Sequence, residues 1–209
     1  MLGHVLEALT GSGLAASAGL NAYIPLLTMG LLARYTDLIE LPNGWSWLGN
    51  GWVLTILALL LAVEFFADKI PMVDSVNDVV QTVVRPTAGG LAFGAGSSSE
   101  TVTVSDPGHF FSSNQWVPVA VGMVIALGVH GIKAAARPVI NAGTAGVGAP
   151  VASTAEDFTS VFMSVIAIVL PFLVLVFFVA IVFSFIWLVR RRRERKRERK
   201  AARAAGFRV

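Results

Sequence analysis

The side chains best suited to chemistry are concentrated in one short stretch of an otherwise apolar chain. Residues 64–86 read EFFADKIPMVDSVNDVVQTVVRP. The candidate binding residues in this stretch are Glu64, Asp68, Lys69, Asp74, Asp78, Gln81 and Arg85. On a helix the last four fall on one stripe, because they are spaced by four, three and four residues. Such a stripe could bind an ion, carry protons or hold an anionic headgroup. The alternative is an interfacial helix with a solvated charged face.

A second polar stretch contains three more candidates, Lys133, Arg137 and Asn141. It follows an apolar run, so its charges would lie near lipid, where charged side chains usually pair or line a wet cavity. We expect Lys133 and Arg137, with Lys69 and Arg85, to attract an anionic substrate or a lipid phosphate.

Three polar residues lie inside the apolar segments themselves. Asn21 and Tyr23 interrupt the first of these segments and could supply polar ligands to a substrate. The alternative is that they hold helices together. Glu64 lies in a Leu-rich run, where burial would make it a candidate proton carrier. The alternative for Glu64 is an ion pair with a lysine or an arginine.

Several kinds of chemistry are not expected. The chain has no cysteine, which excludes disulfides, thiolate catalysis and thiolate metal sites. His4, His109 and His130 are scattered, so no zinc site is predicted. No Ser-His or paired-His pattern suggests a catalytic centre. We therefore expect neither an enzyme nor a bound metal or cofactor.

The composition requires a membrane. Hydrophobic residues make up 55% of the 209 residues, charged residues only 14%, and the mean hydropathy is +0.72. A soluble domain carries about 25% charged residues. The remaining charges are too few to cover a water-facing surface, so lipid must cover much of this protein. We expect a multi-pass protein of the plasma membrane.

The net charge of +3 conceals two different parts. Eleven of the 16 basic residues lie in 190–208, and the residues before them sum to −6. We predict a membrane domain over 1–189 and a disordered basic tail over 190–209. The positive-inside rule places the tail in the cytoplasm, where it could bind anionic lipid headgroups. It lacks an aromatic or groove-reading element, so no nucleic-acid partner is expected.

The apolar pattern predicts an all-α membrane protein of about four transmembrane helices. The candidate spans are Leu14–Ala33, Trp52–Ala67, Trp116–Ala136 and Phe162–Val189. Asn21 and Pro25 predict a break in the first span, and Pro171 predicts a kink in the last. We interpret Ser153 and Thr154, followed by Glu156 and Asp157, as an N-cap for the last helix.

Two stretches do not read as simple spans. Residues 70–96 begin as an amphipathic helix with a valine face and continue into a short Gly-rich segment, which is typical of a re-entrant loop. Residues 137–158 are also rich in Gly and Ala. Counting back from the tail through four spans puts both termini in the cytoplasm. Residues 34–51 and 137–158 would then face outside, and 68–115 inside.

The two middle parts of the chain resemble each other. Trp52 and Trp116 each open an apolar run that reaches a lysine 17 positions later, at Lys69 and Lys133, and an Arg-Pro pair and a Gly-rich stretch follow each. In the four-span scheme these runs have opposite directions, which predicts an inverted repeat of the kind found in transporters. The alternative is coincidence in a chain rich in Trp, Ala and Gly.

Three segments carry a resemblance to a known family. They read AGLNAYIPLL (18–27), EFFADKIPMVDSVNDVVQTVVRPTAGG (64–90) and HGIKAAARPVINAGTAG (130–146). They resemble a bacterial family of membrane proteins of unknown function, DUF4126, over about residues 14–175. The matching positions in the central block are Asp68, Lys69, Pro71, Asp74, Asp78, Gln81, Thr82, Arg85 and Pro86. The resemblance implies a membrane protein but no particular activity.

The leading hypothesis is a small transporter or channel-like permease for an ion or a small anionic solute, with a charged intramembrane site. Because four spans make a thin bundle, we expect a homo-oligomer, most simply a homodimer, surrounded by membrane lipids. One alternative is a lipid-phosphate translocase or lipid-binding protein. Another is a non-transporting scaffold in which the polar line only stabilises helix packing.

Overall fold

A computed structural model describes residues 2–97, 116–145, 147–180, 183, 187 and 190 of the chain. These residues form helices and connecting turns, with no strand among them, so the all-α prediction is confirmed for this part of the chain. The structure divides into two units, Met1–Val174 and Leu175–Val209. Within the second unit residues 175–180 are helical, and the basic tail after Arg190 lies outside the described residues.

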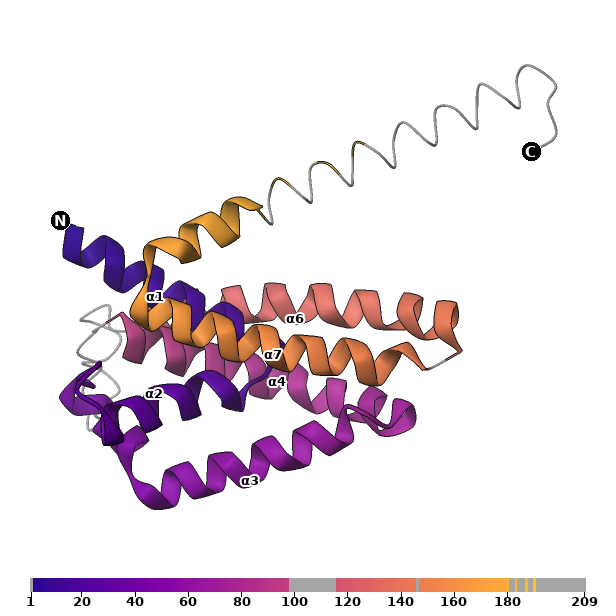
Figure 1. The fold of residues 1–209 in the computed structure, drawn as a ribbon, viewed down its shortest axis with the longest axis horizontal. Coiled ribbons are helices and arrows are strands. Elements are labelled where there is room, and N and C mark those ends of the chain that lie inside the picture. The colour runs from indigo at the N-terminus through magenta and orange to yellow at the C-terminus, as the bar shows by residue number, and fades with distance from the viewer. Residues whose placement is uncertain are drawn as a thin grey trace. The chain divides into compact units, whose positions relative to one another are not determined.

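The first unit contains six α-helices and one 3-10 helix in its described part (Figure 1). In chain order they are α1 (Leu2–Leu20), α2 (Tyr23–Tyr35), η1 (Asn43–Gly49), α3 (Gly51–Ala67), α4 (Pro71–Gly96), α6 (Trp116–Thr144) and α7 (Gly148–Val169). Local capping accounts for some of these boundaries. The Asn50 side chain, for example, accepts a 2.9 Å hydrogen bond from the Trp52 amide at the start of α3.

The helices α1 and α2 form a hairpin instead of one crossing helix (Figure 1). The chain breaks at Asn21, whose side-chain oxygen accepts hydrogen bonds from the amides of Tyr23 (3.1 Å) and Ile24 (3.3 Å). A single cavity is lined by Leu6 from the start of α1 and by Leu41 from the loop after α2. The two outer ends of the hairpin therefore lie together, and its turn points into the unit.

The other four helices alternate in direction. Side-chain contacts join Glu64 to Arg85, Arg85 to His130, and Arg137 to Glu156, which pairs α3 with α4, α4 with α6, and α6 with α7. The α3–α4 and α6–α7 turns lie at one end of the unit (Figure 1). The open ends of the α1–α2 hairpin lie at the other end.

Small residues let these helices approach closely. A Cβ added at Gly89 of α4 would clash with Ala126 of α6. Between α1 and α7, the Ser17 hydroxyl lies 2.7 Å from the hydroxyls of Ser160 and of Ser164. Glycine and serine in these positions fix the depth at which the helices pack.

The exposed faces of α3 and α4 are apolar and their buried faces are polar. In α3 the buried residues are Leu54 and Glu64, while Leu59 and Phe66 are exposed. In α4 five of the six valines are exposed, including Val79 at 72%, while Gln81 and Arg85 are buried. Soluble proteins show the reverse arrangement. The predicted valine face is therefore confirmed, and the alternative of a solvated charged face is wrong for Gln81 and Arg85.

Among the described residues, two helices, α6 and α7, are long and apolar enough to cross a membrane. A third span results if η1 and α3, bent by 62° at their junction, are counted together. The count of four spans is therefore not confirmed on length and hydropathy. Leu14–Ala33 is not one continuous helix, because it contains the turn between α1 and α2. The chain nevertheless has the apolar helices of a membrane protein.

Three other sequence predictions change with the structure. The Gly-rich end of 70–96 is not a separate segment, because α4 continues as one helix through Pro86 to Gly96. The last apolar run is interrupted before Pro171, where α7 ends at Val169. A proline disfavours the α conformation of the residue that precedes it. Residues 43–49 and the α6–α7 turn lie at opposite ends of the unit, whereas the four-span scheme places them on the same side (Figure 1).

The inverted repeat is not confirmed. Since α3 is antiparallel to α4, and α4 is antiparallel to α6, the two proposed copies run in the same direction (Figure 1). Their glycines also have different surroundings. A Cβ at Gly89 would meet α6, whereas a Cβ at Gly143 would meet nothing within 4 Å.

Candidate functional site

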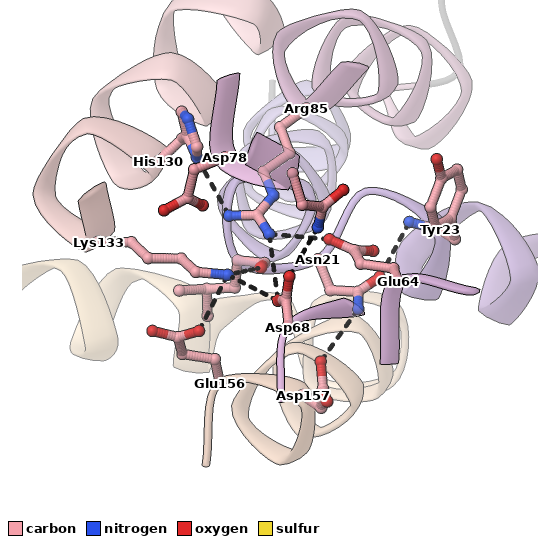
Figure 2. Close-up of polar contacts among 12 residues, drawn as sticks. Asn21, Tyr23, Glu64, Asp68, Asp78, Arg85, His130, Lys133, Glu156 and Asp157 are labelled. Carbon is pink, nitrogen blue, oxygen red and sulfur yellow. Dashed lines mark hydrogen bonds and ion pairs between the residues drawn. The ribbon is translucent and has the colours of Figure 1, made fainter. Parts of the chain in front are cut away.

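The candidate site is a buried network of charges at the inner end of the α1–α2 hairpin (Figure 2). Its most buried member is Arg85 of α4, which is 0% exposed. The Arg85 Nη2 atom donates a 2.8 Å hydrogen bond to Glu64 Oε1, and Arg85 Nη1 lies 3.1 Å from His130 Nδ1. The guanidinium thus connects α3, α4 and α6 inside the unit.

Asp68, in the turn between α3 and α4, lies where three cations meet. Its Oδ2 atom is 3.2 Å from Lys133 Nζ, 3.7 Å from Arg85 Nη2 and 3.9 Å from Arg137 Nη2. Its Oδ1 atom accepts a 2.7 Å hydrogen bond from the side-chain amide of Asn77. The Asp68 side chain is therefore held on both oxygens and is almost fully buried.

Two adjacent carboxylates of α7 complete the network. Glu156 Oε2 lies 2.7 Å from Arg137 Nη2 and 3.0 Å from Lys133 Nζ. Asp157 accepts a 3.0 Å hydrogen bond from the Asn21 amide group, which ties the hairpin turn to α7.

Lys69 extends the network on the side of Asp157. Its Nζ atom lies 3.7 Å from Asp157 Oδ2 and 3.3 Å from the centroid of the Phe65 ring. The Lys69 side chain is 23% exposed, so the network reaches the surface of the unit here.

Among the described residues, the ion pairs of the network join four cations and four carboxylates. Its cations are Lys69, Arg85, Lys133 and Arg137, and its carboxylates are Glu64, Asp68, Glu156 and Asp157. Removing charges from water is costly, and only close pairing and hydrogen bonding offset that cost. This balance explains how so many charges can be buried within a helical unit.

The end of α1 also contributes to the network. The Leu20 carbonyl, at the C-terminal end of α1, accepts a 3.4 Å hydrogen bond from Lys133 Nζ. The last carbonyls of a helix have no partner within it and carry partial negative charge. A lysine at this position therefore stabilises the broken end of α1 inside the unit.

The structure brings together seven of the twelve residues predicted for the site. They are Asn21, Glu64, Asp68, Lys69, Arg85, Lys133 and Arg137.

The other five predicted residues have separate outcomes. Tyr23 lies at the edge of the network, close enough to Glu64 and Gln81 to interact with both, and Gln81 is buried (Figure 2). Asp78 lies beside His130 (Figure 2). Asn141 lies one turn beyond Arg137, and its Oδ1 has no hydrogen-bond partner in the described part of the chain. The side chain of Asp74 lies outside the described residues.

Sequence reasoning missed three members of the site. The N-cap interpretation of Glu156 and Asp157 is wrong, because α7 begins at Gly148 and both residues lie inside the helix. The sequence signal that could have identified them is the pair of cations Lys133 and Arg137, which need nearby carboxylates when they are buried. His130 was dismissed only as a metal ligand. In the structure it contacts the Arg85 guanidinium through one ring nitrogen and the Thr82 hydroxyl, at 3.1 Å, through the other.

Several buried polar atoms of the network have no hydrogen-bond partner among the described residues. They include Glu64 Oε2, Asp78 Oδ1, Gln81 Oε1, Arg85 Nε and Asp157 Oδ2. A buried polar atom without a partner is costly, so these atoms indicate capacity to bind water, an ion or a polar ligand. In the described part of the chain, no group of three or more His, Asp or Glu residues is arranged to hold a metal ion.

These features define a helical membrane protein with a charge network buried in its interior. A family model, the Domain of unknown function (DUF4126), matches residues 8–191, and the chain belongs to this family. No curated protein and no solved structure matches the chain.

Proposed function

We propose that this protein is a small membrane transporter or channel-like permease for an ion or a small anionic solute. The observation that supports it is the position of the α1–α2 turn inside the buried charge network. Asn21, at this turn, contacts Asp157, and the preceding carbonyl of Leu20 contacts Lys133. Helices broken within the membrane are a common way to bring backbone polar groups to a transported ion.

The charge balance of the network suits a transport site better than a site that holds an ion permanently. Three of the four cations, Arg85, Lys133 and Arg137, share the carboxylates of Glu64, Asp68 and Glu156. A further ion can bind only by replacing one of these contacts or by entering with a counter-charge. An exchangeable site of this kind releases its ion again, which transport requires.

The proposed membrane arrangement follows from the outward-facing apolar side chains. In it α3, α4, α6 and α7 all cross, although α4 carries more charge than a simple span allows. Its exposed valines face lipid and its charged residues face the network. The α1–α2 hairpin enters from one face of the membrane and returns to it. The bundle is thin, so we propose a homo-oligomer, such as a homodimer, in the plasma membrane, with both termini cytoplasmic.

Flux through purified protein tests the proposal. The full chain, reconstituted in liposomes, is expected to conduct or exchange at least one of proton, sodium, chloride or a small carboxylate. Lys133→Gln should lower that flux at least tenfold, whereas Arg34→Gln should leave it unchanged, because Arg34 is exposed and donates a hydrogen bond to the Gly49 carbonyl instead of to a member of the network. Absence of flux for all four probes, or equal flux in Lys133→Gln and wild type, would contradict the proposal.

A second candidate function is lipid binding, favoured by an apolar cavity of about 380 Å³. The cavity lies between α2, α3 and α7, and its lining includes Ile24, Leu61, Phe65 and Asp157. An acyl chain could occupy it with a headgroup near Asp157. Native mass spectrometry of the purified protein tests this function, because a bound lipid should be lost when Leu61→Trp fills the cavity.

A further inference from the structure

The meeting point of the three cations has the form of an anion site that a side chain of the protein already fills. Lys133, Arg85 and Arg137 all lie within 3.9 Å of one oxygen atom, Asp68 Oδ2. Planar guanidinium groups suit the two oxygens of a carboxylate, and the Lys133 ammonium adds a third donor. A site with these three donors is suited to bind a carboxylate group.

Asp68 differs from the other carboxylates at this point in two ways. Glu64 and Glu156 lie within helices α3 and α7, whereas Asp68 lies in the short turn between α3 and α4. The two arginines are also nearer to the other carboxylates, with Arg85 at 2.8 Å from Glu64 and Arg137 at 2.7 Å from Glu156. Withdrawing Asp68 would therefore leave both of these short arginine–carboxylate pairs in place, although it would break the 2.7 Å hydrogen bond from the Asn77 side chain.

We infer that this meeting point is a binding site for a small monocarboxylate anion, and that the Asp68 carboxylate occupies it until such an anion displaces it. The inference names the substrate class of the transporter proposed above and rests on that proposal. The charge of the ligand follows from Asp68 itself, because an anion that replaces this singly charged carboxylate beside Lys133, Arg85 and Arg137 restores the same charge. The size follows from Asp68 itself, whose side chain beyond Cα has the dimensions of acetate.

The network comes nearest to the surface beside the α3–α4 turn. The side chains of Lys69 and Glu156 are 23% and 18% exposed, while that of Asp68 is 3% exposed. An anion that enters on this side would pass these two side chains before it reached Asp68. Movement of the turn that carries Asp68 would open the site.

Chemical rescue tests the binding site without requiring transport. Asp68→Ala should lower the melting temperature of the detergent-solubilised full chain, and saturating acetate should raise it again by about 5 °C. Gluconate, which has the same charge but a larger body, should not raise it. Asp157→Ala is the matched control, because its carboxylate pairs with the more exposed Lys69 and should show no acetate rescue. If Asp68→Ala does not fold, Asp68→Ser opens the same space while keeping a hydroxyl for Lys133.

Flux measurements then separate the inference from the proposed function. The probe is labelled pyruvate, which stays ionised at neutral pH, taken up into proteoliposomes. Wild type should transport it, and Asp68→Ser should admit it with at least a fivefold lower half-saturating concentration, because no side chain competes. If acetate raises the melting temperature of Asp68→Ala but wild type shows no flux, the monocarboxylate site is supported and the transporter proposal is wrong. Flux of another ion in wild type, with no acetate rescue in either Asp68 variant, would overturn the monocarboxylate site and keep the transporter.

Discussion

Replacing Arg85 should destabilise the protein more than replacing any exposed arginine. Arg85 is fully buried and its guanidinium contacts Glu64, Asp68 and His130. Arg85→Met keeps most of the side-chain volume but leaves the Glu64 carboxylate buried without its closest cation. Breaking a buried ion pair in this way costs about 3–5 kcal/mol. For a chain of this size the melting temperature should fall by roughly 6–20 °C, at about 2–4 °C per kcal/mol.

The assay is the thermal unfolding of the purified protein in detergent, followed by tryptophan fluorescence. Arg34→Met is the matched control, because Arg34 is exposed and should cost about 0.5 kcal/mol or less. Arg85→Lys should fall between the two, since an ammonium cannot reach both Glu64 and His130 as the guanidinium does. Adding Glu64→Gln to Arg85→Met should recover much of the loss, because the unpaired charge is removed. Equal melting temperatures for Arg85→Met and Arg34→Met would refute the buried network.

Two further predictions concern packing and topology. Gly89→Leu should cost about 1–3 kcal/mol of unfolding free energy by forcing α4 away from α6, whereas Gly143→Leu, in open space, should change thermal stability little. Because the chain has no cysteine, single cysteines at Gly3 and Ala205 report on each terminus through an impermeant reagent. With both termini cytoplasmic, neither should react in intact cells. Labelling of one alone would show an odd number of crossings between them, with residues 172–189 as the candidate for the additional one.

Much of the local structure could be predicted because it depends on near neighbours in the chain. The valines of 73–84 recur at helical spacing opposite polar residues, and this predicted a helix with two faces. Asn21 competes with the backbone for hydrogen bonds, and the structure breaks at that residue. Pro171 disfavours the helical conformation of the residue before it, and α7 ends just ahead of it.

The members of the site were only partly predictable. A charged residue in an apolar chain needs a partner, so Glu64 was identified from its place in a Leu-rich run, and Arg85 and Lys133 from polar stretches next to apolar runs. Glu156 and Asp157 were not, because a carboxylate after Ser and Thr also fits a helix cap, and the local pattern is the same in both cases. The difference is that α7 begins five residues before Ser153.

The sequence by itself determined that this chain is a helical membrane protein, that helices break at Asn21 and before Pro171, and that one face of α4 is apolar. Only the tertiary structure decided that α1 and α2 turn back as a hairpin, that α3 and α6 run in the same direction, and which carboxylate meets which cation. Hydropathy and periodicity are local, and they are unchanged when a helix reverses direction. Direction and pairing depend on contacts between distant residues, such as Asn21 with Asp157 across 136 positions of the chain. These contacts exist only once close packing of glycine and serine faces has fixed the position of each helix.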